Sequence, residues 1–571
     1  MASMSPAQLG AVVAACAVRG AESWAVDPSW LAARSAALVS GLGVAMTTAA
    51  DPRRTTALDP ATAGRIDRWR AGWLPRLSAS VGQSVRRPDG STVGGGWVQG
   101  QLLAGAAREG PGHSPGPLYA ASVGTAMVSL ERAVVRRAGS GEGMHFTGTT
   151  GGRVSVFGPG LEDGILALEH TLRTDPESSR AFLLGPVPAE RDVLVVDHLV
   201  GDRFRLLSDE QAAASLAALG ELVVEAGSDP RDGQSTHLAA RFVNDVGATA
   251  ASAQDLPRFR RALGPALYPL ATVIGSHPDA LCDLLDGTTQ QGVDAQQLDS
   301  VERLVREGRE PGTSDIVWAD RRTAAAALGE LALDRVDGSS ASDGPTRAPA
   351  LVHAVESLAE RQQPDLLSAV ARDGAGDPHA LDAAARRVGS TVGFIVASGG
   401  ETLAGVRATQ DEAHTAMTAI ADLVVDDVPL PHQLGTVGAA LARHAAAGVV
   451  AELLPTDAES AQRAATAATL GRIGDGAIAA GRTVVSEAAP WSAAQSPQTW
   501  AAATTRHVTP FWGADGAPRP ETELQTAELR SFNDWRRDLA LSVYDEVPAR
   551  IRAGIQAGAA QAVTQVPRHS S

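Results

Sequence analysis

Apolar residues recur mostly at helical spacing along this chain. Ser208 and Gln211 have the spacing of a capping box, in which each side chain satisfies a backbone N–H group that a helix start leaves free. Behind this box the apolar residues recur every three or four positions, at Leu216, Leu219, Leu222 and Val223. The pattern predicts a helix that begins after Ser208 and ends near Gly227.

Two further segments carry the same kind of start signal. Thr409 is followed by Glu412, and Thr456 by Glu459. Strand signals are sparse by comparison. We therefore predict a mainly α fold of multi-helical, bundle-like domains.

The clearest strand pattern is the alternation at residues 154–157, between glycine-containing turns. It predicts at most a small β-hairpin near residues 145–158. The apolar run at residues 193–196 is consistent with a short strand or with a buried helix, because a run of this length fits both periods.

Segments rich in turn-forming residues suggest the domain plan. The stretch at residues 339–349 is dominated by Ser, Gly, Asp and Pro and has the composition of a linker. We predict a helical region at 1–140, a helical domain with the hairpin at 141–338, a second helical domain at 350–490 and a helical tail at 491–571.

Charge is unevenly distributed over the 571 residues. The net charge is −16, yet residues 1–140 contain 14 arginines and eight acidic residues, a net of +6, which leaves −22 for the remainder. The acidic total argues against nucleic-acid binding. The basic N-terminal region suggests an acidic protein partner or intramolecular steering.

All 49 basic residues are arginine, and asparagine occurs only at Asn244 and Asn533. Lysine and asparagine codons are both AT-rich, so their joint scarcity indicates a G+C-rich genome of the actinobacterial kind. Escape from a lysine-directed modification is the alternative reading of a lysine-free chain.

Several chemistries lack their motifs. Asp411-Glu-Ala-His414 spells a helicase box, but the phosphate-binding GxxxxGK[ST] loop needs a lysine. There is no HExxH, CxxC, GxSxG or GxGxxG sequence, and residues 389–393 only approximate the nucleophile motif. We therefore expect no metal, no cofactor and no catalytic residues, and favour a non-enzymatic protein; an active site assembled from distant residues remains an alternative.

No run approaches the roughly 18 apolar residues of a membrane-spanning helix. The apolar run at residues 9–18 follows no basic residue and is a poor secretory signal. We expect a cytoplasmic protein, or one exported by a leaderless route.

A candidate partner surface lies in the basic N-terminal region. Trp69 and Trp73 are four residues apart and share one helix face, with arginines close by. Arginine and tryptophan are enriched at interface hot spots. The alternative is that the tryptophans are core residues and the arginines are solvated. The candidate residues are Arg65, Arg68, Trp69, Arg70, Trp73 and Arg76.

The order of features between residues 150 and 490 suggests a family. The segments 153–159, 161–164, 175–182 and 197–203 precede the helix after Ser208, and an apolar pair follows at 410–454. In this order the chain resembles a large helical domain of unknown function from streptomycetes and related actinobacteria. Those proteins are often linked to type VII secretion or to toxin-like chains.

That resemblance implies a helical body and transfers no catalytic residue. The chain also departs in two ways from the pattern of type VII secretion substrates. Trp97-Val-Gln-Gly100 is one residue longer than a Trp-x-Gly turn. The tyrosines lack the acidic residue that a Tyr-x-x-x-Asp/Glu export signal has at its fourth following position; they are Tyr119, Tyr268 and Tyr544.

We therefore predict a structural or protein-interaction component that docks a partner through its N-terminal region, with oligomerisation left open. An alternative is an effector or toxin acting through residues 491–571, where four tryptophans occur. Membrane insertion of helices near residues 392–454 is disfavoured, because their acidic residues would be costly in lipid.

Overall fold

The computed structural model describes residues 5–17, 28–55, 59–86, 92–138, 156, 163–188, 190–252, 255–277, 321–333 and 524–530, with single positions between 350 and 402 and between 553 and 561. Of this part of the chain 82% is helical, so the predicted mainly α fold is confirmed. Two compact units are present, Met1–Val273 with Gln296–Val317, and Ile274–Ala295 with Trp318–Ser571.

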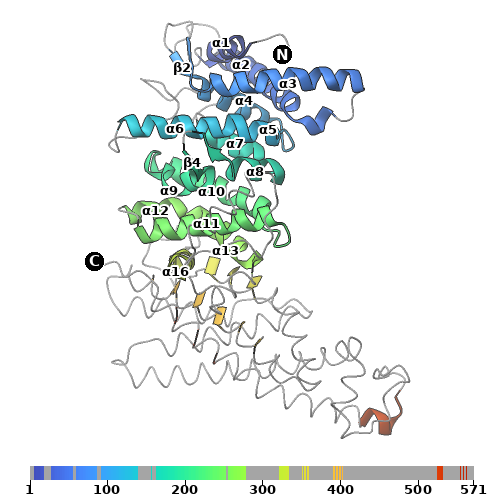
Figure 1. Cartoon of the computed structure of the whole chain (residues 1–571), viewed down its shortest axis with the longest axis vertical. Coiled ribbons are helices and arrows are strands. Elements are labelled where there is room, and N and C mark those ends of the chain that lie inside the picture. The colour runs from blue at the N-terminus through green and yellow to red at the C-terminus, as the bar shows by residue number, and fades with distance from the viewer. Residues whose placement is uncertain are drawn as a thin grey trace. The chain divides into compact units, whose positions relative to one another are not determined.

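The first unit is a stack of helices (Figure 1). Its N-terminal part contains α1 (Pro6–Ala17), α2 (Pro28–Ala50), the 3₁₀ turn η2 (Pro52–Thr55), α3 (Pro60–Ser80), α4 (Gly95–Arg108), α5 (Pro117–Tyr119), the π-helical turn η3 (Ala120–Gly124) and α6 (Thr125–Ala138). Next come α7 (Gly164–Leu172), α8 (Pro176–Leu183), α9 (Val195–Gly201), η4 (Arg203–Arg205), α10 (Asp209–Gly227), α11 (Gly233–Ser252), α12 (Leu256–Leu263) and η5 (Gly264–Ala266).

Helix α13 (Leu267–Ser276) begins in the first unit and ends in the second. In the second unit the described elements are α16 (Arg321–Glu330) and η7 (Leu331–Leu333). The predicted linker at 339–349 and the predicted helix starts at Thr409 and Thr456 lie outside the described residues.

The strands form two small antiparallel pairs. Strand β1 (Ser84–Arg86) pairs with β2 (Thr92–Gly94), with Val85 opposite Val93. Strand β3 (Pro186–Val187) pairs with β4 (Glu190–Leu194). The hairpin predicted near 145–158 falls on residues that, apart from residue 156, are not described. The run at 193–196 is divided, since β4 ends at Leu194 and α9 begins at Val195.

The local signals around α10 are confirmed. Ser208 caps the helix, its hydroxyl accepting from the Gln211 N–H group at 3.4 Å, and the Gln211 amide oxygen accepts from the Ser208 N–H group at 3.3 Å. The helix ends at Gly227. Its apolar positions Leu216, Leu219, Leu222 and Val223 are buried.

Helix α4 packs against both α2 and α7 in the N-terminal part of the first unit (Figure 1). Every residue of α4 from Gly95 to Ala106 is buried. Glycine allows the close packing. A Cβ at Gly43 of α2 would collide with the Leu102 carbonyl oxygen, and one at Gly100 would collide with Gly164 at the start of α7. A helix buried on all sides needs neighbours on all sides.

This packing joins the predicted region 1–140 to the residues that follow it. Helix α4 precedes residue 140 and α7 follows it, yet they share one core. The predicted boundaries at 140 and 338 themselves lie outside the described residues.

Candidate functional site

Helix α3 carries the six residues that the sequence nominates as a partner surface. It starts where Asp59 accepts a hydrogen bond from the Thr62 N–H group at 3.0 Å and Pro60 occupies the first turn, a favourable start for a helix. Arg70 and Trp73 are buried. Trp69 is half-buried and stacks on Trp73, with ring centroids 4.6 Å apart. The exposed members are Arg65, Arg68 and Arg76.

Arg70 is an internal contact between α2 and α3. Its guanidinium donates from Nε to the Ala49 carbonyl at 3.1 Å and from Nη2 to the Asp51 carbonyl at 3.3 Å. Both carbonyls lie at the C-terminal end of α2, where helix carbonyls lack partners within the helix. Its Nη1 also pairs with Asp67 at 2.6 Å. Arg70 thus caps α2, and the structure does not place it beside the exposed arginines.

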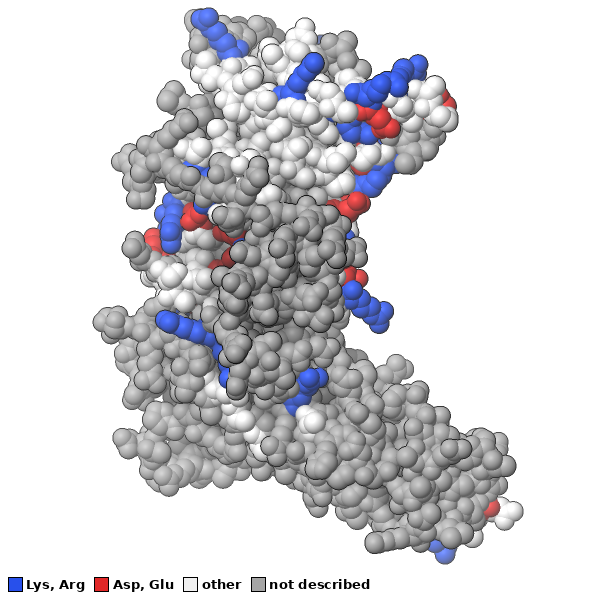
Figure 2. All heavy atoms as spheres, in the orientation of Figure 1, with Lys and Arg blue, Asp and Glu red and all other residues white. Residues whose placement is uncertain are grey.

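The outward face of α3 consists of arginines separated by small residues. Arg65, Arg68 and Arg76 project from one side of the helix, among the exposed small residues Ala61, Ala71, Gly72, Pro75 and Ala79. Asp67 is also exposed on α3, where it pairs with Arg70. A Cβ at Gly72 would meet no atom within 4 Å. Figure 2 shows basic side chains projecting over the N-terminal end of the molecule. We call this set of three arginines and the small residues among them the α3 arginine face.

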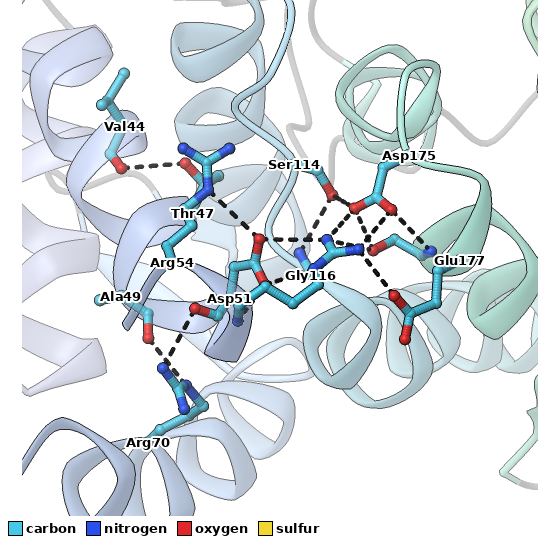
Figure 3. A network of polar contacts seen from close by, with 12 residues as sticks. Val44, Thr47, Ala49, Asp51, Arg54, Arg70, Ser114, Gly116, Asp175 and Glu177 are labelled. Carbon is cyan, nitrogen blue, oxygen red and sulfur yellow. Dashed lines mark hydrogen bonds and ion pairs between the residues drawn. The ribbon is translucent and has the colours of Figure 1, made fainter. Parts of the chain in front are cut away.

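A second polar cluster joins η2, the loop before α5 and the start of α8 (Figure 3). Arg53 pairs with Asp51 at 2.9 Å, with Glu177 at 3.0 Å and, more closely, with Asp175. Ser114 also donates to Asp175 and accepts from the Gly116 N–H group at 3.2 Å. The cluster connects residues that lie over 120 positions apart in the sequence.

Electrostatics hold Asp175 ionised in this cluster. Burial alone would raise the pKa of Asp175, but hydrogen bonds from Arg53, Ser114 and Ser178 outweigh it and lower the pKa well below its usual range. The hydrogen bonds that Arg53 donates to Asp175 and Asp51 raise the pKa of Arg53. The cluster is therefore a charged clamp between segments of the first unit.

Replacing Arg53 with alanine is expected to destabilise the first unit by about 1–2 kcal/mol, a value discounted because 40% of the Arg53 side chain is exposed. The stabilisation by Asp175 is full above the ordinary pKa of aspartate and is lost as the pH falls through its lowered value. The difference between the two proteins, measured by chemical denaturation, should therefore shrink in acid.

Glu177→Gln is the matched control, because its side chain is 60% exposed and contacts the same guanidinium. It should change the stability by less than about 0.5 kcal/mol. An equal loss in both variants, or a difference independent of pH, would contradict the clamp.

The third cluster is buried and centres on Arg203, whose side chain is fully inaccessible. Its Nε donates to Glu131 of α6 at 3.1 Å, and its other nitrogens donate to Asp163, the N-cap of α7, and to Ser215 of α10. His198 of α9 donates from Nε2 to Glu131 at 2.8 Å. One guanidinium thus joins four elements of the first unit.

Glu169 of α7 lies beside this cluster without a hydrogen bond. It is fully buried, and neither carboxyl oxygen has a partner among the described residues. Burial raises the pKa of Glu169 well above its usual range; the charges of Asp163 and Glu131 raise it further, and Arg203 offsets only part. The surroundings of Glu169 therefore favour its protonated form.

A fourth cluster lies on the other side of α9. Asp197 accepts from Arg241 of α11 at 2.6 Å and from the Leu194 N–H group at 2.9 Å. Burial and the neighbouring Asp197 raise the pKa of Asp245 well above its usual range. Burial lowers the pKa of His237 to about 4, and Arg241 adds to this effect.

Sequence reasoning identified few of these groups. Asp197 and His198 are noticeable as an adjacent acid and histidine, but the structure places them in different clusters, with Arg241 and with Glu131 respectively. The described residues include no group of three or more His, Cys, Asp or Glu side chains that could hold a metal ion. Within the same residues, no helix is both long and apolar enough to span a bilayer.

No family model matches the chain, and no curated protein or solved structure matches it either. The resemblance to an actinobacterial helical domain therefore stays a prediction. The clusters around Arg53, Arg203 and Asp197 join elements of the first unit. The α3 arginine face instead projects outward.

Proposed function

We propose that the chain is a non-enzymatic protein-interaction component that docks an acidic protein on the α3 arginine face. The observation that supports this proposal is that the arginines of this face are not paired with carboxylates in the described part of the chain. Arg68 and Arg76 form no hydrogen bond or ion pair within the described part of the chain, and Arg65 contacts only the Thr62 hydroxyl there, at 2.8 Å. Arg53 and Arg203, in contrast, are paired with carboxylates.

The small residues of this face favour a close partner. Glycine inside a helix costs about 1 kcal/mol relative to alanine, and no neighbouring atom requires it at Gly72. Ala71 and Ala79 likewise leave the helix backbone accessible. A protein surface can therefore approach the backbone while arginines on either side reach its carboxylates.

An anionic membrane is a less suitable target for this face. A helix that binds a bilayer surface inserts an apolar side into the lipid. In α3 the apolar residues Trp73, Leu74 and Leu77 are buried in the protein, and the exposed residues are arginines, small residues and Asp67. The geometry therefore favours a protein partner that is acidic, consistent with the +6 charge of residues 1–140.

The test is charge reversal of Arg65, Arg68 and Arg76 together, in the full chain. Deleting residues 1–140 is unsuitable, because it would remove α2 and α4 from the core. Proteins captured from source cells are identified, purified and titrated against both forms. We expect an acidic partner whose affinity falls about 10- to 100-fold on reversal and also falls with added salt.

Arg231→Glu is the control, since Arg231 is exposed and lies outside α3. It should leave the affinity unchanged. The proposal fails if the triple variant binds the partner as tightly as the unchanged chain. It also fails if the arginines are needed only for binding to vesicles of anionic phospholipid.

A further inference from the structure

The carboxyl groups around Arg203 outnumber its positive charge. Asp163 and Glu131 both receive hydrogen bonds from the guanidinium, and Glu169 is a third buried carboxyl group near it. All three acids are at most 5% exposed. Water can therefore contribute little to stabilising a third negative charge at this place.

Among the described residues, no further cation forms a hydrogen bond with Glu169. Helix α7 contributes Asp163 at its N-cap, α6 contributes Glu131, and η4 contributes Arg203. The other contacts of Arg203 and Glu131 are Ser215 of α10 and His198 of α9. Helix α4, which packs closely on α7, has no charged residue between Gly95 and Ala107. At the far end of α7, Arg173 is already paired with Glu221 of α10 at 2.9 Å.

We propose that the stability of the first unit depends on a proton bound by Glu169. The folded unit binds one proton at this carboxyl group, and the junction of α6, α7 and η4 loosens when the proton leaves. Ionised Glu169 would have to compete with Asp163 and Glu131 for one guanidinium. It would also lie without a hydrogen-bond donor inside the core. Opening of the junction would let water reach the carboxylate.

The direction of the pH effect follows from proton linkage. The pKa of Glu169 is raised in the folded protein, so the folded state binds one proton more than the unfolded state between the ordinary and the raised value. The stabilising contribution of Glu169 is complete below the ordinary pKa of glutamate. It is lost as the pH rises towards the raised pKa, with about a tenfold increase in the unfolding constant for each pH unit.

The experiment compares the full chain with its Glu169→Gln variant by hydrogen exchange of the α7 amides, corrected for intrinsic exchange rates, over about pH 5–9. Glutamine keeps the shape of the neutral acid and cannot ionise. We expect protection in the unchanged chain to fall about tenfold per pH unit relative to Glu169→Gln. Parallel pH profiles for the two proteins would overturn the proposal, because a purely packing role gives a constant offset.

Glu131→Gln is the contrasting control. Burial alone would raise the pKa of Glu131, but Arg203 and His198 outweigh it and lower the pKa. In Glu131→Gln the α7 amides should be less protected from exchange. Their protection should still fall as the pH rises, as it does in the unchanged chain.

A second measurement does not depend on how the variants fold. A protonated carboxyl group has its own infrared carbonyl band, and ¹³C labelling of glutamate separates Glu169 from Asp245, whose pKa is also raised. The glutamate band should be present at neutral pH and should disappear together with the protection of α7. Its absence at neutral pH would show that Glu169 is ionised and would overturn the proposal.

Discussion

Replacing Arg203 with methionine is expected to cost the first unit at least about 4 kcal/mol at neutral pH, enough to unfold much of it. The change removes the guanidinium that donates to both Glu131 and Asp163, and it leaves these buried carboxylates without their shared cation. Removing one partner of a buried pair is costly because the other charge stays in a medium of low polarity. Chemical denaturation, or the yield of folded full chain, measures the loss.

The Arg203→Met variant should regain part of its stability as the pH falls. In the absence of the guanidinium, the carboxyl groups of Glu131 and Asp163 can be accommodated once they are protonated. Arg261→Met is the control, because Arg261 is 62% exposed and its pair with Asp209 lies at the surface. The control should lose less than about 1 kcal/mol. A folded, fully stable Arg203→Met protein at neutral pH would refute this account of the cluster.

The second large effect is expected at Gly43. Adding a single methyl group in Gly43→Ala should destabilise the first unit by about 3 kcal/mol or more, since the new Cβ would collide with the Leu102 carbonyl oxygen of α4. A backbone oxygen cannot rotate away as a flexible side chain does. Helices α2 and α4 would have to separate along their shared contact.

Gly41 offers a control on the same helix. It is exposed, and a Cβ added there would meet no atom within 4 Å. Alanine is a better helix former than glycine, so Gly41→Ala should raise the stability by up to about 1 kcal/mol. Thermal unfolding of both variants gives the comparison. Similar changes in both variants would show that helix propensity, and not close packing, determines the effect at Gly43.

The sequence predicted what depends on nearby residues. The start and end of α10 could be placed because the cap, the apolar period and the terminal glycine all lie within that segment. The mainly α class follows from the same kind of signal. The β1–β2 hairpin was missed because its strands have three residues each, too few to show alternation.

The clusters depend on residues far apart in the chain. Arg203 is 40 residues from Asp163 and 72 from Glu131, and nothing near Arg203 distinguishes it from a solvated arginine. Within α3, the four-residue spacing correctly predicted that Trp69 and Trp73 lie side by side on the helix. It could not show that Arg70 turns inward, because that contact requires the end of α2 beside it.

The burial of α4 on all sides also has a consequence for synthesis of the chain. Its residues leave the ribosome before those of α7, which cover one of its sides. Until residues 164–172 emerge, an apolar helix surface has no partner, and such surfaces bind chaperones or aggregate. Slower translation just after α4 would prolong that exposed interval, whereas rapid passage through residues 109–172 would shorten it. The yield of folded protein should therefore be sensitive to codon choice in that interval.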